Sequence, residues 1–170
     1  MDVFYGGAIQ GAQNRSERAA VHQAFIEKIK KMGYHVLTEH TTGNSYEEAI
    51  RRLEESIGPL PKDGLKRRQY VRDKMIEFVE SDIDAAVFEL SIPSLGTGIE
   101  FAHAYLRPQM GLKMIPVIGL YQKNYWPNKL STMIRGISKE NISHVTVYDY
   151  DDIADAKQFL ETVFKMLKEQ

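Results

Sequence analysis

Apolar residues along this chain fall into two patterns, short continuous runs and longer stretches with helical spacing. Residues 85–88, Ala-Ala-Val-Phe, form a continuous run, which is typical of a strand covered on both faces of a parallel sheet. Between residues 14 and 32 the apolar positions instead recur every three to four residues, and Gly33 follows as a helix C-cap. The pattern therefore predicts buried strands that alternate with amphipathic helices.

The same criteria predict the other elements. Strands are expected over residues 3–5, 35–38, 83–90, 114–121 and 144–148, and helical segments over residues 14–32, 45–56, 65–80, 95–106, 130–134 and 151–168. Pro116 within the fourth strand favours a bulge or an edge position. Five strands that alternate with helices imply right-handed crossovers. We therefore expect an α/β fold over residues 1–170, a single-domain doubly wound (flavodoxin-like) five-stranded parallel sheet with helices on both faces.

Composition excludes several classes of protein. The 170 residues include no cysteine, which rules out a disulfide scaffold, a thiolate metal site and a cysteine nucleophile. With 22 Lys and Arg against 23 Asp and Glu, the formal net charge is −1, so no large basic surface for nucleic acid is expected. No apolar run reaches the roughly 20 residues of a membrane span, and the N-terminus shows neither a signal nor a transit pattern. We expect a cytoplasmic protein with no membrane or nucleic-acid partner.

Glycines and polar residues gather after the predicted strands. In doubly wound sheets, ligands bind beyond the carboxyl ends of the strands, where the strand order reverses. Residues 6–11, 38–40 and 89–100 follow strands at that edge. The first of these segments holds Gly6, Gly7 and Gly11 ahead of a helix, so it is either a phosphate cradle or a plain tight turn. Its spacing matches neither the dinucleotide fingerprint nor a P-loop.

Residues 91–100, Ser-Ile-Pro-Ser-Leu-Gly-Thr-Gly-Ile-Glu, form a second strand-to-helix connection with two serines and two glycines. It could hold an anion or a sugar, with Glu100 in the first helical turn facing the mouth of the sheet. Thr97 and Glu100 also have the spacing of a capping box, in which the glutamate only satisfies a backbone N–H. From the residues alone, the cap is favoured over a catalytic role.

Asp73 lies in a predicted helix that is rich in basic residues. These are Lys66, Arg67, Arg68, Arg72 and Lys74. Such a helix face is usually solvated and salt-bridged. As a nucleic-acid patch it is short, its own helix carries Glu77 and Glu80, and no aromatic stripe accompanies it. The five histidines show no pair at metal-ligand spacing, so no metal site is expected, and His40 alone lies near the expected ligand edge.

Taken together, these segments resemble the 2′-deoxynucleoside 5′-phosphate N-hydrolase family, within the wider nucleoside 2-deoxyribosyltransferase group. The most specific are Pro-Ser-Leu-Gly-Thr-Gly-Ile-Glu at residues 93–100 and Leu-Ser-Thr-Met-Ile-Arg-Gly at residues 130–136. Gly-Ala-Ile-Gln-Gly at residues 7–11, Leu-Thr-Glu-His at residues 37–40 and Asp73 support them. The matches keep their order from Phe4 to about Tyr150, so the resemblance implies one nucleoside 2-deoxyribosyltransferase-like domain over residues 1–170.

The resemblance implies hydrolysis of the N-glycosidic bond of (deoxy)nucleoside 5′-monophosphates, without a cofactor, to free base and (deoxy)ribose 5-phosphate. Glu100 aligns with the family's catalytic glutamate, which attacks the anomeric carbon and forms a glycosyl–enzyme intermediate. Asp73 aligns with the acid that assists base departure and water attack. Retaining glycosidases use two carboxyl groups about 5 Å apart in this way.

The resemblance also implies which residues bind the substrate. Ser94 and backbone groups of the first loop would hold the phosphate, and His40 would lie near the base and sugar. Ser131 aligns with a serine that comes from the neighbouring subunit in the family, which implies a homodimer with shared sites. The implied substrate-binding residues are Phe4, Tyr5, Gly6, Gly7, Ala8, Ile9, Gln10, Gly11, His40, Ser94, Gly96, Ser131 and Met133.

Three residues depart from the family pattern. Phe4 stands where relatives typically carry a tyrosine close to the sugar, so discrimination between ribose and deoxyribose could weaken. Ala8 and Gln10 stand where relatives commonly carry Ser and Arg. Because Gln10 supplies no charge, phosphate binding would rest more on backbone N–H groups and serines, with Arg15 as a candidate replacement.

Two other functions stay open at this point. A 2-deoxyribosyltransferase would form the same covalent intermediate and pass the sugar to a second base instead of water. A transferase would also accept unphosphorylated nucleosides. Gln10, in place of the family's arginine, is compatible with such substrates. A nucleotide-binding module without catalysis would use the same loops, but it would need neither Glu100 nor Asp73 to hold a phosphate.

Overall fold

In the computed structural model, five parallel strands form one sheet in the order β2-β1-β3-β4-β5. The structure describes residues 1–8, 15–123, 125, 129–137 and 140–169. The strands are β1 (Asp2–Gly7), β2 (His35–Val36), β3 (Ala85–Glu89), β4 (Val117–Gln122) and β5 (Val145–Tyr150). The chain reverses its direction of winding between β1 and β3, so the predicted doubly wound, flavodoxin-like α/β sheet is confirmed.

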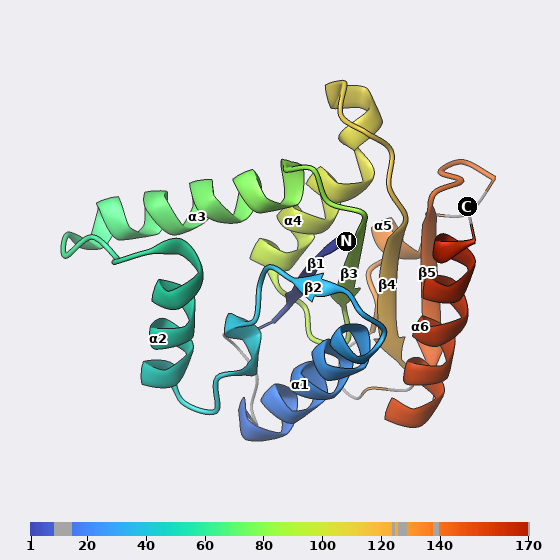
Figure 1. The fold of residues 1–170 in the computed structure, drawn as a ribbon, viewed down its shortest axis with the longest axis horizontal. Coiled ribbons are helices and arrows are strands. Elements are labelled where there is room, and N and C mark those ends of the chain that lie inside the picture. The colour runs from blue at the N-terminus through green and yellow to red at the C-terminus, as the bar shows by residue number, and fades with distance from the viewer. Residues whose placement is uncertain (9–14, 124, 126–128, 138–139, 170) are drawn as a thin grey trace.

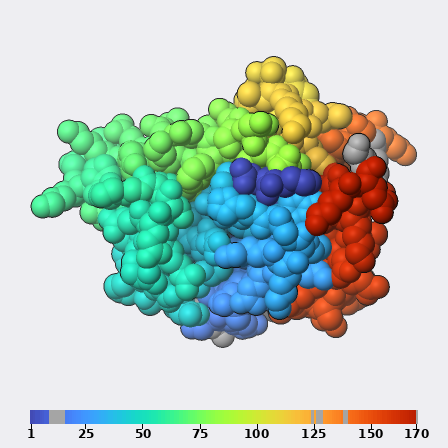
Figure 2. Space-filling view, viewed as in Figure 1, coloured from blue at the N-terminus to red at the C-terminus, as the bar shows by residue number. Residues whose placement is uncertain are grey.

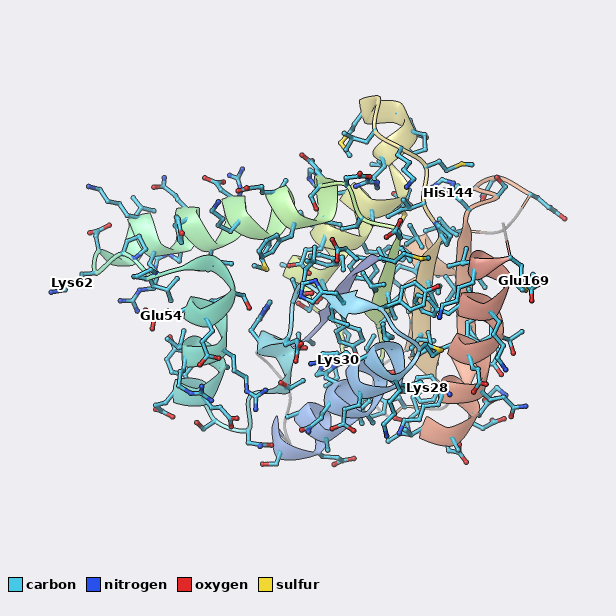
Figure 3. All side chains as sticks on the ribbon, in the orientation of Figure 1. Lys28, Lys30, Glu54, Lys62, His144 and Glu169 are labelled. Atoms are coloured by element: carbon cyan, nitrogen blue, oxygen red, sulfur yellow. The ribbon has the colours of Figure 1, made fainter. Side chains whose placement is uncertain are left out.

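Helices cover both faces of this sheet (Figure 1). They are α1 (Arg15–Lys31), α2 (Tyr46–Ile57), α3 (Gly64–Glu80), α4 (Leu95–Tyr105), α5 (Thr132–Arg135) and α6 (Ile153–Lys168), with short 3-10 helices η1 (His40–Thr42) and η2 (Arg107–Met110). On one face, α1 and α6 lie side by side, and Lys28 of α1 forms an ion pair of 2.5 Å with Glu161 of α6 (Figure 3). On the other face lie α3 and α4.

Each face of the sheet has its own apolar core. Phe25 of α1 and Phe164 of α6 pack with Val87 of β3 on one side. Phe101 of α4 packs with Phe88 of β3 on the other, with ring centroids 5.2 Å apart. Because neighbouring residues of β3 are buried on opposite faces, the strand is apolar without alternation.

All five predicted strands differ from the observed strands by up to three residues at an end, and the structure explains the differences at β2 and β4. β2 ends at Val36, because the Thr38 side chain replaces strand pairing: its hydroxyl accepts from the Tyr5 N–H at 2.9 Å and donates to the Tyr5 carbonyl at 2.6 Å. Pro116 precedes β4, which lies between β3 and β5, so the predicted bulge or edge position is wrong. Proline lacks an N–H group, but Pro116 stands before the strand and does not interrupt its pairing. Its carbonyl accepts from the Ala86 N–H at 3.0 Å.

The two helices α2 and α3 stand out at one side of the molecule and run across each other, not antiparallel (Figures 1 and 2). We call them, together with the connecting residues 58–63, the hairpin. Ser45 caps α2 as predicted, accepting from the Glu48 N–H at 3.1 Å, while the Glu48 carboxylate accepts from the Asn44 N–H at 3.0 Å. Leu53 and Met75 pack the two helices together. The hairpin extends beyond the carboxyl edge of β1 and forms a wall there.

Candidate active site

A pocket of about 490 Å³ opens at the carboxyl edge of the sheet, beside the point where the strand order reverses. Its walls come from the end of β1, η1, the first turns of α4 and the facing sides of α2 and α3. The predicted site residues that it brings together are Phe4, Tyr5, Gly6, Gly7, His40, Ser94, Gly96 and Glu100. The pocket therefore unites segments that are up to 96 positions apart in the sequence, from Phe4 to Glu100.

The floor of the pocket is the glycine pair at the end of β1. A Cβ on Gly6 would lie 2.6 Å from Cδ1 of Phe88 and 3.2 Å from Oε2 of Glu100, so the Glu100 carboxylate lies directly against the Gly6 backbone. A Cβ on Gly7 would lie 2.4 Å from the ring of His22. Neither position has room for a side chain, so packing against Phe88 and His22 requires glycine at both.

Glu100 is the one carboxyl group among the described residues that line this pocket. The predicted capping box is wrong: Ser94 is the N-cap of α4, and its hydroxyl accepts from the Thr97 N–H at 3.3 Å. Glu100 therefore lies further along the helix, half-buried, with its carboxylate in the pocket. Burial raises the pKa of Glu100 to about 7, since an apolar environment disfavours the charged form.

Ser94 and Gly96, at the N-terminus of α4, line the pocket. The Ser94 hydroxyl keeps its own proton for a ligand, because it acts as an acceptor in the cap. The first N–H groups of an α-helix lack intrahelical partners and carry a partial positive charge. This corner of the pocket is therefore suited to an anion.

His40 and Thr41 form a buried polar wall on η1. Within the part of the chain that the structure describes, Nδ1 of His40 and the hydroxyl of Thr41 have no hydrogen-bond partner. Burial lowers the pKa of His40 to about 4, so the ring is neutral at physiological pH. A buried polar group without a partner is costly, and a ligand with a hydroxyl or ring nitrogen would satisfy both side chains.

Asp73 is not brought into this pocket. Its side chain is 63 % exposed and forms an ion pair of 3.1 Å with the neighbouring Arg72. Helical geometry explains the placement: Val71, Arg72, Met75 and Ile76 line the pocket from one face of α3, and Asp73 lies on the opposite face. The close pair of carboxyl groups that the resemblance implies is therefore absent from the described pocket.

Two further predicted residues, Ser131 and Met133, lie outside the pocket. Ser131 is the N-cap of α5 and accepts from the Met133 N–H at 3.2 Å, and the Met133 side chain is 82 % exposed. Ala8 is buried behind the pocket lining. The predicted contacts of Ile9, Gln10 and Gly11 lie outside the described residues.

The wall formed by the hairpin was not predicted from the sequence. This wall is apolar near its middle and cationic towards its tip, and its residues are Tyr46, Ala49, Ile50, Leu53, Leu60, Arg67, Arg68, Val71, Arg72, Met75 and Ile76. The apolar stripes of both helices were visible in the sequence, but periodicity does not indicate what a stripe covers. The basic segment of α3, interpreted above as a solvated face, thus contributes three arginines to the pocket.

A buried ion pair supports the floor of the site from below. Arg18 of α1 contacts Glu89, the last residue of β3, with 2.6 Å between the guanidinium and carboxylate, and the two side chains are 3 % and 0 % exposed. The second Glu89 oxygen accepts from the hydroxyls of Ser91 and Tyr150. Burial alone would lower the pKa of Arg18, but the Glu89 carboxylate raises it, so the guanidinium stays charged. This cluster ties α1, β3 and β5 together at the edge that carries the pocket.

A second buried contact holds the first residue after β1. The Tyr5 hydroxyl and Nδ1 of His22 are 2.9 Å apart, and Nε2 of His22 lies 3.3 Å from the Ala8 carbonyl. Since a carbonyl only accepts, Nε2 carries the proton and Nδ1 accepts from Tyr5. Burial lowers the pKa of His22, which keeps this neutral tautomer. The chain is thus fixed at Ala8 where it leaves the pocket floor.

No group of three or more His, Asp or Glu side chains among the described residues is arranged to hold a metal ion. In the same part of the chain, no helix combines the length and the apolar character that crossing a membrane requires.

The fold and the pocket define a doubly wound α/β protein with a pocket at its switch point. No family model matches the chain. The chain is 32 % identical over 152 residues to a protein from Thermofilum pendens, a match that covers 89 % of each chain. It is 29 % identical over 154 residues to a protein from Nematostella vectensis, covering 90 % of this chain and 88 % of the relative. Both relatives are named "Putative 2′-deoxynucleoside 5′-phosphate N-hydrolase 1". The chain belongs to the 2′-deoxynucleoside 5′-phosphate N-hydrolase family.

Proposed function

We propose that this protein hydrolyses the bond between base and sugar in (deoxy)nucleoside 5′-monophosphates, with Glu100 as the nucleophile. One observation carries the proposal: the Glu100 carboxylate lies against Gly6 at the strand switch point, in a pocket where it is the one carboxyl group among the described lining residues. The names of the relatives supply the substrate class.

In the proposed reaction, an oxygen of the Glu100 carboxylate forms a bond to C1′ of the sugar. The bond from C1′ to the base nitrogen breaks, and the base leaves with the electron pair and takes up a proton. Water then attacks C1′ of the glycosyl ester, and the bond between C1′ and the Glu100 oxygen breaks. This releases (deoxy)ribose 5-phosphate and regenerates the carboxylate, and the proton that the water loses balances the one taken up by the base. An ionised Glu100 also stabilises the positive charge that develops on the sugar in the transition state.

Two corners of the pocket would orient the substrate. Ser94 and the first N–H groups of α4 suit the 5′-phosphate. The unpartnered Nδ1 of neutral His40 and the Thr41 hydroxyl suit the sugar hydroxyl or the base edge. Asp73 has no role in the proposed mechanism, because its exposed side chain lies on the face of α3 opposite the pocket.

We predict that kcat/KM for base release rises about tenfold per pH unit up to about pH 7 and then levels off. The nucleophile must be ionised, and burial raises the pKa of Glu100 to about 7. A general-acid role for Glu100 predicts the reverse, a rate that falls above pH 7. The substrate phosphate also ionises, near pH 6. Measuring how tightly a Glu100→Gln variant binds the same nucleotide over the same pH range separates the effect of phosphate ionisation from that of Glu100.

The experiment that tests the proposed function measures free base released from a deoxynucleoside 5′-monophosphate and from the matching unphosphorylated nucleoside. Release that requires the 5′-phosphate supports the hydrolase. Adding a second free base distinguishes a transferase, which would form the exchanged nucleotide in preference to the free sugar phosphate. Tight nucleotide binding with no base released over long incubation would overturn the proposal in favour of a binding module.

We also propose that two copies of the chain form the complete site. Leu95 and Ile99, one turn apart on α4, are 91 % and 53 % exposed, and Ile99 also lines the pocket. Two neighbouring exposed apolar side chains beside a site are suited to contact with a partner subunit. A homodimer would explain why Ser131 and Met133, which the family resemblance assigns to the site, lie outside the pocket of their own chain.

A Leu95→Glu variant is expected to shift the protein from dimer to monomer in sedimentation velocity and to lose most base release. Burying an unpaired charge at the contact is costly, whereas the free monomer keeps the charge in water. Met166→Glu, on an exposed position of α6, is the matched control and should leave the dimer intact. A wild-type protein that is fully active as a monomer would contradict this part of the account.

A further inference from the structure

The pocket extends well beyond the carboxylate at its inner end. Its lining along α3 runs from Ile76, near the contact of α3 with α4, to Arg67 near the tip of the hairpin. At 1.5 Å per residue, these nine steps correspond to about 13 Å along the helix axis. Leu60, in the loop between α2 and α3, also lines the pocket. A sugar at Glu100 and its base would occupy the inner part of this length.

The middle of the pocket is an apolar slot. Ala49 and Ile50 of α2 and Val71 and Ile76 of α3 line it, and the contact of Leu53 with Met75 joins the two helices. Apolar walls on two sides suit the faces of a flat aromatic ring, and they offer few hydrogen-bonding groups that could select one base edge. The base of a nucleotide held at Glu100 would therefore lie in this slot, with its outer edge directed towards the distal end.

The distal end is cationic. Arg67, Arg68 and Arg72 all line the pocket from the same face of α3. Nε of Arg67 donates to the Pro61 carbonyl at 3.0 Å, which fixes that side chain. Arg68 has no ion pair or hydrogen bond among the described residues, and Arg72 contacts only the exposed Asp73 beside it, a pair of a kind that contributes little. Two guanidinium groups are thus available to an anion.

The charge of the lining is unbalanced. Against the three arginines stands a single carboxyl group, Glu100, at the opposite end of the pocket. Outside the lining, Lys62, labelled in Figure 3, and Asp63 stand next to each other in sequence at the loop between α2 and α3, so their charges offset. Guanidinium groups bind carboxylate and phosphate oxygens in pairs, so this end is chemically matched to an acidic group.

We propose that Arg68 and Arg72 form a second anion subsite, which binds an acidic substituent carried by the base of the substrate. This inference rests on the proposed function, because the base is oriented by the sugar at Glu100. The substrate class is then a nucleoside 5′-monophosphate with an enlarged base, such as one with a carboxylate on an arm of two or three carbons. The phosphate corner and the distal arginines would hold the two ends of this ligand.

The test compares two nucleoside 5′-monophosphates that differ only in the base substituent, a carboxypropyl arm and a neutral propyl arm. The measured quantity is the ratio of kcat/KM for the acidic to the neutral nucleotide. The wild-type protein should favour the acidic one, and Arg68→Gln and Arg72→Gln should each lower the ratio by about fivefold, the upper range for a partly exposed ion pair. Lys66→Gln is the matched control: it removes the same charge from the opposite face of α3, outside the pocket, and should leave the ratio unchanged.

An equal ratio in wild type and in both arginine variants would overturn the subsite. An equal fall with Lys66→Gln would also overturn it, because it would show a general field of the basic helix and no specific contact. Binding of both nucleotides to Glu100→Gln protein, measured by calorimetry, keeps the test independent of catalysis. If no nucleotide releases base but the acidic one still binds more tightly through Arg68, the proposed function fails while the subsite stands.

Discussion

Replacing Glu100 by Gln is expected to lower base release from a deoxynucleoside 5′-monophosphate by about a thousandfold or more. The amide keeps the shape of the side chain but cannot attack C1′ or balance the positive charge of the transition state. A thousandfold loss corresponds to about 4 kcal/mol of transition-state stabilisation. Base release followed by chromatography measures the effect. Glu77→Gln, on the exposed side of α3, is the matched carboxylate-to-amide control.

The same Glu100→Gln variant should be more stable than the wild type at pH 8 and equal to it near pH 4. Burial raises the pKa of Glu100 in the folded protein above its unfolded value, so holding the charged form costs stability above about pH 7 and nothing below the unfolded value. We expect a gain of about 2 kcal/mol at pH 8, reduced from the full shift because the side chain is only half-buried. Urea unfolding at both pH values checks it. Unaltered base release in this folded variant would remove Glu100 from the mechanism.

Breaking the buried pair of Arg18 and Glu89 is expected to give the largest loss of stability. An Arg18→Met variant leaves the fully buried Glu89 carboxylate without its cation, and such losses amount to about 3–5 kcal/mol. The measurement is the free energy of unfolding in urea. Adding Glu89→Leu to this variant should recover much of the loss, because the unpaired charge is then removed.

The exposed pair Arg51 and Glu55 on α2 provides the control for this prediction. Both side chains are 60 % exposed, so Arg51→Met should change stability by less than about 0.5 kcal/mol. If Arg18→Met cost no more than Arg51→Met, the buried cluster would not be what holds α1, β3 and β5 together at the edge that carries the pocket.

The sheet was predictable because each strand leaves a local signal. A continuous apolar run such as residues 85–88 requires cover on both faces of the sheet. Gly33, which follows α1, has the positive φ of 87° that a helix C-cap needs. The strand ends were less predictable. Thr38 satisfies the backbone of Tyr5 with its side chain, and nothing in the local sequence distinguishes that contact from one more strand residue.

The candidate site was only partly predictable. Glycines and serines after strands marked the edge, and the family resemblance separated Glu100 from an ordinary cap. The hairpin wall depends on how α2 and α3 pack together, a tertiary contact between Leu53 and Met75 that periodicity does not encode. Arg68 and Asp73 lie five residues apart in one basic segment. Which of them lines the pocket could not be predicted until the packing partner of α3 was known.

The most direct test of the central claim is whether base release leaves the sugar phosphate on Glu100. Acid quenching during turnover, followed by peptide mass spectrometry, would trap the ester. The account predicts an adduct of (deoxy)ribose 5-phosphate on the peptide that contains Glu100, formed together with the first equivalent of free base. Base release at the same rate with no adduct, or with the adduct on another side chain, would contradict it.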